Sequence, residues 1–170
     1  HQRDWCLRLC SQLACLQVLE PLFWRYPTVV VLVASWRGGL VDIEFITQYL
    51  TLKYAPTQPD ILGLGTRDTL TALMEAKLLD ADNGRNLIDA FDLWQGLQGL
   101  LSLTIDGEIT AEREDEISSA LKNDLVMVAG GGPAPPGNFA ALKELIEARA
   151  DTVYRLFQEM IEKPAANLPP

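Results

Sequence analysis

Apolar side chains recur at three- and four-residue steps along the chain from Leu40 onward, which is the spacing of one face of an α-helix. In the first such segment, for example, Ile43, Ile46 and Leu50 follow one another in this way. Five helices are predicted from the pattern. They are expected over residues 42–54, 66–79, from Asp80 or Asp82 to the Asp106-Gly107 break, 112–126 and 138–162.

Turn-forming and capping residues set the expected ends of these helices. Pro56 and Pro59 end the first helix, because proline lacks the N–H that a helix interior needs. Thr66 is a candidate N-cap of the second helix, since its hydroxyl can accept from a free backbone N–H. The glycine- and proline-rich residues 130–137 are predicted to be a loop, and Pro164 is predicted to end the last helix.

Residues 1–36 do not continue the helical pattern. Leu7–Leu19 is predicted to be a helix, whereas Thr28–Ala34 is β-branched and typical of a strand that has no partner strand in the chain. We therefore divide the chain into an atypical N-terminal segment (1–36), a helical domain (37–163) and a disordered tail (164–170). Short connections between amphipathic helices predict an all-α fold, an antiparallel bundle of about five helices.

Charge narrows the classes of partner. The net charge is −9. Residues 1–40 contain four basic and two acidic side chains, a charge of +2, so the remaining 130 residues carry −11. This excess of acidic side chains argues against nucleic acid as a binding partner, because phosphate backbones are bound by clustered Lys and Arg. The most apolar run, Val29–Ala34, is far shorter than the ~20 residues of a spanning helix, so no membrane partner is expected.

The cysteine and histidine content argues against a metal site. Cys6, Cys10 and Cys15 do not have the CxxC spacing, and His1 is the only histidine. An odd number of cysteines without a clear signal peptide favours the cytoplasm. No Walker loop, GxGxxG, HExxH or GxSxG motif is present.

The segment Arg37–Phe45 (RGGLVDIEF) is the candidate site. Gly38 and Gly39 allow a tight turn, and a helix with acidic residues near its start follows. Arg37 stands immediately before the turn, where its guanidinium is placed to bind a phosphate. An arginine, a tight turn and acids at a helix start are compatible with a phosphate–metal site.

The two acids of this segment have a simpler interpretation beside the functional one. Asp42 is a candidate N-cap and Glu44 a first-turn acid that interacts with the helix dipole. Residues two apart on a helix point about 200° apart, so Asp42 and Glu44 do not both face one site if both are helical. If Asp42 is the cap instead, its side chain turns back over the helix end, and Glu44 and Gln48 share the next face.

The run Arg37–Leu50 (RGGLVDIEFITQYL) resembles a signature of glutamine synthetase adenylyltransferase, and the DIEF version resembles its second, adenylylating half. The resemblance extends over about residues 37–163, through Lys53-Tyr54-Ala55 to the closing helix that begins at Phe139. It implies that the chain is the helical domain that follows a nucleotidyltransferase core. The core's Gly-Ser turn and Asp-x-Asp pair have no match here, so the chain is expected to be a fragment without the catalytic core.

The resemblance also implies an activity. The family enzyme transfers AMP from ATP to a tyrosine of glutamine synthetase, and its other half removes the AMP by phosphorolysis. ATP and Mg²⁺ are the expected cofactors of the whole enzyme, with none expected for this fragment alone. Arg37, Gly38 and Gly39 would contribute to nucleotide binding, and Asp42 and Glu44 would support catalysis at the edge of a site that the missing core completes. The implied partners are that core, glutamine synthetase and the PII signalling protein.

Several alternatives stay open at this point. The chain is either part of the enzyme or a non-catalytic helical module that docks on glutamine synthetase or a PII protein. A uridylyltransferase is a third hypothesis, disfavoured because no HD-type histidines or ACT-like strands follow residue 163. Residues 1–36 depart from the family, so they are either a remnant of the core that has diverged or the product of a reading-frame error.

Overall fold

The computed structural model describes residues 37–104 and 118–166, and all regular secondary structure in these two ranges is helical. The elements are α4 (Leu40–Tyr54), η2 (Pro59–Ile61), α5 (Thr66–Glu75), α6 (Ala81–Thr104), α7 (Ser119–Ala129), α8 (Phe139–Phe157), η4 (Gln158–Glu162) and α9 (Lys163–Ala166). The predicted all-α fold is therefore confirmed. The helix expected at 7–19, the strand expected at 28–34 and the Asp106-Gly107 break lie outside the described residues.

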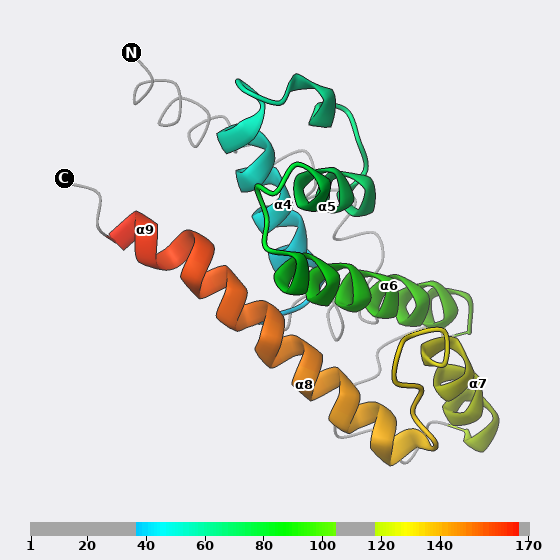
Figure 1. The fold of residues 1–170 in the computed structure, drawn as a ribbon. Coiled ribbons are helices and arrows are strands. Elements are labelled where there is room, and N and C mark those ends of the chain that lie inside the picture. Colours follow the sequence, from blue (N-terminus) through cyan, green and yellow to red (C-terminus); the bar gives the residue numbers. More distant parts are fainter. Residues whose placement is uncertain (1–36, 105–117, 167–170) are drawn as a thin grey trace.

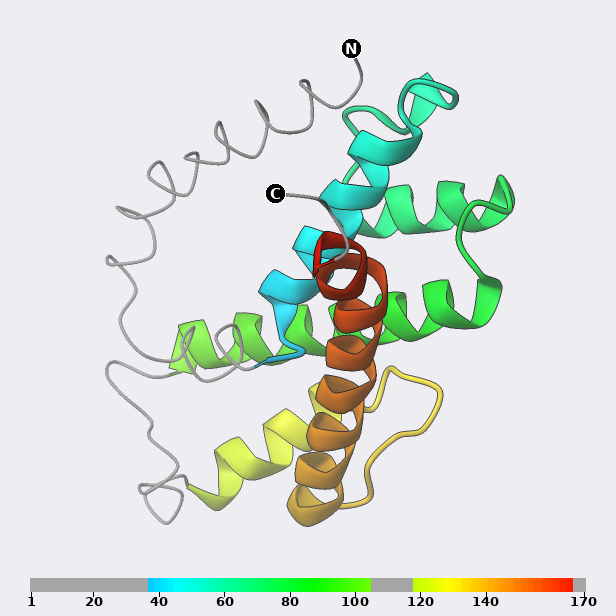
Figure 2. The same ribbon diagram turned by 90° about the vertical axis from the view of Figure 1, so that its left-hand side faces the viewer.

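The helices form one packed body in which α6 lies crosswise to both α4 and α8 (Figures 1 and 2). Helix α5 packs on α6, and α7 packs against α6 and the start of α8. The C-terminal part of α8 and η4 packs against α4. This arrangement brings the N-terminus of α4 beside the C-terminal half of α8, where the candidate site lies.

The predicted apolar faces form the core. Ile43, Ile46 and Leu50 of α4 are buried, and Tyr54 is partly buried against them. The other buried stripes come from α5, α6 and α8: Leu70, Leu73, Leu87, Trp94, Leu97, Leu101, Leu142, Val153 and Leu156. Burying a large aliphatic side chain contributes about 1.5–3 kcal/mol, so these stripes are the main source of stability.

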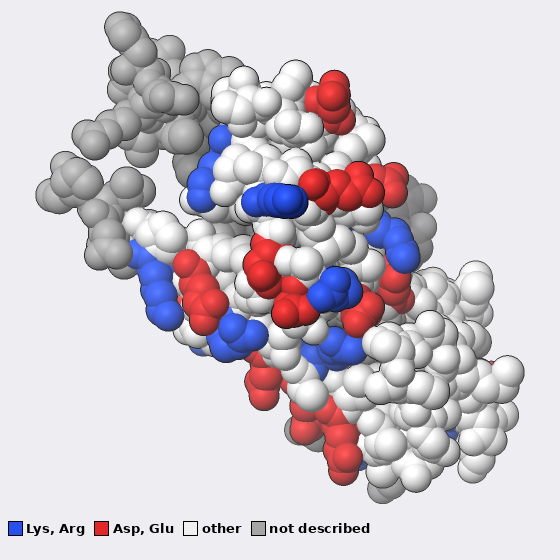
Figure 3. Space-filling view, in the orientation of Figure 1, with Lys and Arg blue, Asp and Glu red and all other residues white. Residues whose placement is uncertain are grey.

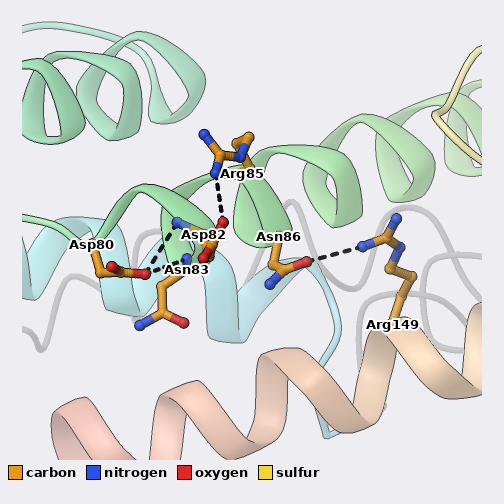
Figure 4. A network of polar contacts seen from close by, with 6 residues as sticks. All are labelled: Asp80, Asp82, Asn83, Arg85, Asn86 and Arg149. Atoms are coloured by element: carbon orange, nitrogen blue, oxygen red, sulfur yellow. Dashed lines mark hydrogen bonds and ion pairs between the residues drawn. The ribbon is translucent and has the colours of Figure 1, made fainter.

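The prediction that Asp80 or Asp82 caps the third helix is confirmed for Asp80. The Asp80 carboxylate accepts from the backbone N–H groups of Asp82 and Asn83, both at 3.0 Å, so Asp80 is the cap (Figure 4). Further along, Arg149 of α8 donates to Asn86 of α6 at 3.3 Å and lies 3.4 Å from the Asp89 carboxylate. These contacts tie α8 to α6.

The predicted N-cap at Thr66 is wrong. Gly65 is the cap residue, and its carbonyl already accepts from the N–H of Thr69 at 2.9 Å, so Thr66 is the first helical residue. Helix α5 also ends at Glu75 rather than at residue 79. Lys77 has a left-handed backbone (φ 57°), and the N–H groups of Leu78 and Leu79 both return to the Leu73 carbonyl, which closes the helix.

The fourth and fifth helices begin at side-chain caps. Ser118 accepts from the Leu121 N–H, so α7 starts at Ser119; the part of the prediction at 112–117 lies outside the described residues. Helix α7 continues to Ala129, three residues beyond the predicted end. Asn138 caps α8 by accepting from the Ala141 N–H at 2.9 Å, and residues 130–137 form the predicted loop.

The predicted end of the last helix at Pro164 is also wrong, because Pro164 lies inside α9. The π-helical turn η4 precedes it, in which the Lys163 N–H bonds to the Gln158 carbonyl, five residues back. A π turn shifts the hydrogen-bond register. In a regular α-helix the proline ring would strike the carbonyl one turn earlier, and the backbone hydrogen bonds of η4 do not follow that regular register. Residues 164–166 of the predicted tail lie in α9, and residues 167–170 lie outside the described residues.

Candidate functional site

The Arg37–Gly39 turn lies directly on the backbone of α8. Gly38 and Gly39 are buried, and Gly38 has φ 83°, in the left-handed region. A Cβ atom added at Gly38 would lie 2.8 Å from the Ala150 Cα and still closer to the Ala150 carbonyl group. Only glycine combines this backbone angle with so close an approach, so the first glycine of the motif fixes where α4 meets α8.

Asp42 holds the turn from inside the helix. Its carboxylate accepts from the Gly38 N–H at 2.6 Å, while Gly39 is the residue at the N-cap. The interpretation of Asp42 as the N-cap is therefore wrong: α4 begins two residues earlier than predicted, and Asp42 belongs to its first turn. A first-turn acid that reaches back over the helix start satisfies a backbone donor in the manner of a capping box.

The Asp42 carboxyl is half-buried and lies near a second acid. Burial raises the pKa of Asp42, and the negative charge of Glu162 in η4 raises it further. The hydrogen bond from Gly38 and the positive charge of Arg37 act in the opposite direction, and the net pKa shift is upward. The turn thus keeps a carboxyl group in place beside Arg37.

Glu44 lies elsewhere on α4. Both Asp42 and Glu44 are helical, so their side chains leave the axis about 200° apart, and the structure does not bring them together. Glu44 is half-buried, burial raises its pKa, and it has no hydrogen bond or ion pair to the described residues. Glu44 lies in the second turn of α4, because the helix starts at Leu40. The interpretation of Glu44 as a first-turn acid is therefore wrong.

Arg37 is exposed and is held by α8. Its guanidinium donates to the Tyr154 hydroxyl at 2.8 Å and lies 5.1 Å from the centre of the Tyr154 ring. Gln158 donates to the same hydroxyl at 3.1 Å. Tyr154, Gln158 and Glu162 were not among the predicted site residues, because they are more than 110 residues away from Arg37 in sequence and no local motif marks them.

A second polar region lies on the other side of α8. A surface cavity of about 310 Å³ is lined by Arg67, Asp89, Asp92 and Arg149, and by Gly131 and Gly132 of the α7–α8 loop. Each arginine faces an aspartate, Arg67 with Asp92 and Arg149 with Asp89. Because each arginine is already paired with an aspartate, this cavity is poorly suited to bind an anion.

The described residues limit the other kinds of site. Within residues 37–104 and 118–166, no group of three or more His, Cys, Asp or Glu side chains is arranged to hold a metal ion. No helix in these ranges has the length and apolar character needed to cross a membrane.

The raised pKa of Glu44 predicts a stability effect that depends on pH. The folded state binds this proton more tightly than the unfolded state, so the stabilisation is complete below the ordinary Glu pKa of about 4.3 and is lost as the pH rises through the higher folded value. Glu44→Gln should therefore gain melting temperature relative to the unsubstituted chain between pH 4 and pH 7, as measured by circular dichroism. Glu75→Gln, at an exposed carboxylate, is the matched control. A difference for Glu44→Gln that stays constant with pH would contradict this.

The chain is similar in sequence to several known proteins. It is 30% identical over 127 residues to a bifunctional glutamine synthetase adenylyltransferase/adenylyl-removing enzyme of a Bradyrhizobium species, and 30% identical over 128 residues to that of Xanthobacter autotrophicus. A relative of the same name from Aromatoleum aromaticum is 39% identical over 84 residues, 45% of this chain. The first two matches cover 74% and 75% of this chain.

The chain matches only a small part of these longer relatives. The chain spans 12% of the length of the Bradyrhizobium and Xanthobacter relatives. No family model matches the chain, and no solved structure matches it. The resemblance carried by Arg37–Leu50 is therefore confirmed: the chain is homologous to a part of the glutamine synthetase adenylyltransferases.

Proposed function

We propose that this homologue of part of glutamine synthetase adenylyltransferase is the helical domain that completes an adenylyl-transfer site, with the nucleotidyltransferase core supplied by other residues. The observation that carries the proposal is the turn at the start of α4. The buried Gly38 fixes this turn on α8, and the exposed Arg37 guanidinium is held at its edge. A fixed cation at an open edge is suited to bind a phosphate group that another module presents.

The proposed reaction moves AMP from ATP to a tyrosine of glutamine synthetase. The bond between the α-phosphorus and the bridging oxygen breaks, a bond from the tyrosine oxygen to the α-phosphorus forms, pyrophosphate leaves, and the tyrosine gives up its proton. In the whole enzyme a second half removes the AMP by phosphorolysis. The proposed setting is the cytoplasm, and PII is a proposed regulatory partner.

Each residue of the turn has a proposed part. Arg37 binds a phosphate oxygen of the nucleotide, and Gly38 and Gly39, buried in the turn against α8, hold Arg37 in place rather than contacting the nucleotide themselves. Asp42 keeps the turn closed through its bond to the Gly38 N–H. Glu44, on another face of α4, is proposed to support the metal–nucleotide end or the packing of the core. With only these two separated acids, the residues of the turn do not fit a Mg²⁺ site, so the metal's ligands are assigned to the core.

A second candidate function is a non-catalytic docking module. The face over α7 and the loop after it is almost free of charged side chains (Figure 3). Helix α7 also has two exposed apolar side chains near its end, Met127, 76% exposed, and Val128, 40% exposed. Exposed apolar side chains that gather on one face are a feature of protein contact surfaces. Under this alternative the chain binds glutamine synthetase or a PII protein without contributing to transfer.

A reconstitution assay separates the two functions. The Xanthobacter autotrophicus relative is produced without the 128 residues that match this chain, and the full 170-residue chain is added to it with ATP, Mg²⁺ and glutamine synthetase. We expect the mixture to add the mass of one AMP to the synthetase subunit, and neither component to do so alone. Binding of the chain to the synthetase with no mass gain would support the docking module and contradict the enzymatic role.

A further inference from the structure

We infer that Tyr154 is a positioning residue for this transfer: its ring and hydroxyl hold the Arg37 guanidinium in place for the nucleotide phosphates, and Gln158 holds the hydroxyl. This inference rests on the proposed function, because Arg37 is the group through which Tyr154 would act. It adds two residues of α8 and η4 that the motif at 37–50 does not contain.

Arg37 is held in one place before any ligand binds. It has contacts of two kinds with one side chain, a hydrogen bond of 2.8 Å to the hydroxyl and a cation–π contact of 5.1 Å to the ring. An exposed arginine otherwise samples many rotamers, and losing that freedom on binding weakens affinity. The Tyr154 contacts remove most of that loss, because the guanidinium already occupies one place.

Arg37 and Tyr154 have hydrogen-bond donors without an acceptor among the described residues. The Tyr154 oxygen accepts from Arg37 and from Gln158, which fills both of its acceptor positions and leaves its O–H without an acceptor among the described residues. Arg37 has five N–H donors, and among the described residues one of them is hydrogen-bonded, to Tyr154. The other Arg37 N–H groups and the Tyr154 O–H therefore belong to the same exposed edge, and such donors are what an oxyanion such as a phosphate binds.

The Gly38 turn and the π-helical turn η4 place Arg37, Tyr154 and Gln158 next to one another. The Gly38 turn fixes the backbone just after Arg37 against Ala150, one helical turn before Tyr154 on α8. Gln158 begins the π-helical turn η4, an irregular geometry that is often found at functional sites. The same turn carries Glu162, whose charge acts on Asp42, and η4 itself packs against α4.

The test uses the reconstituted mixture of the full chain with the truncated relative. Tyr154→Phe keeps the ring and removes the hydroxyl, and we expect it to raise KM for ATP roughly tenfold while KM for glutamine synthetase stays unchanged. Tyr49→Phe is the matched control, since Tyr49 is a half-buried tyrosine of α4 that contacts Lys53 and not Arg37. It should change neither constant.

A double-mutant cycle separates positioning from simple support of the fold. In a chain that already has Arg37→Ala, Tyr154→Phe should add almost nothing, because its effect passes through the arginine. An equal fold-change in both backgrounds, or an unchanged KM for ATP with Arg37 present, would overturn this inference while leaving the proposed function in place. Absence of transfer by the unsubstituted mixture would overturn the proposed function and this inference with it.

Discussion

Replacing Gly38 with alanine is expected to lower the free energy of unfolding of the chain by about 2–5 kcal/mol. Two costs add at this position. The left-handed backbone, φ 83°, costs a residue with a Cβ about 1–2 kcal/mol. The new methyl group also overlaps the Ala150 carbonyl group, and a backbone group cannot rotate away as a side chain can. Chemical denaturation of the 170-residue chain measures the sum.

Gly63 is the matched control for this substitution. It has nearly the same backbone angle, φ 80°, but an added Cβ would meet no atom within 4 Å. Gly63→Ala should therefore show only the backbone cost, about 1–2 kcal/mol. Equal losses at the two positions would mean that the turn does not rest on α8 as described, and that the start of α4 is free to move.

Replacing Arg37 with alanine is expected to reduce kcat/KM for AMP transfer by about a hundredfold in the reconstituted mixture, the size of effect found when one preorganised donor is removed from a transition state. The chain should remain folded, because Arg37 is exposed and its contacts to Tyr154 lie at the surface. Arg37→Lys should recover only part of the loss, since an ammonium group cannot form the same paired bonds to a phosphate.

Arg85→Ala is the control for the loss of a surface arginine. Arg85 is 63% exposed and pairs with Asp82 within α6. This change should leave kcat/KM within about twofold, because exposed ion pairs contribute little. If Arg37→Ala also stays within that range, Arg37 has no part in the transfer, and the docking module becomes the better account.

The fold was largely predictable because it depends on local spacing. The stripe of Ile43, Ile46 and Leu50 marks a helix face whatever packs on it, and the same holds for Leu87, Trp94 and Leu97. Caps were harder to assign, since the backbone decides which residue is the first helical one. Thr66 and Asp42 are chemically good caps, but glycines one or more residues earlier have the extended backbone that the cap position needs.

The site was predictable only on the α4 side. Arg37, Gly38 and Asp42 form a local motif, and the structure joins them in one turn. Tyr154, which accepts from Arg37, and Gln158, which donates to Tyr154, lie on α8 and η4, more than 110 residues along the chain. The periodicity of one helix does not show which residues another helix packs against it. Glu44 belongs to the same motif in sequence but to another face of the helix in space, since residues two apart point in different directions.

Under the proposed function, Arg37, held by the turn on α8, contacts a phosphate of the bound nucleotide. A crystal structure of the reconstituted complex with a non-hydrolysable ATP analogue tests this most directly. The account predicts an Arg37 nitrogen within about 3 Å of a phosphate oxygen, with the Gly38 turn still against Ala150. A bound nucleotide on the far side of the core, with the Arg37 guanidinium in contact with Tyr154 alone, would contradict it.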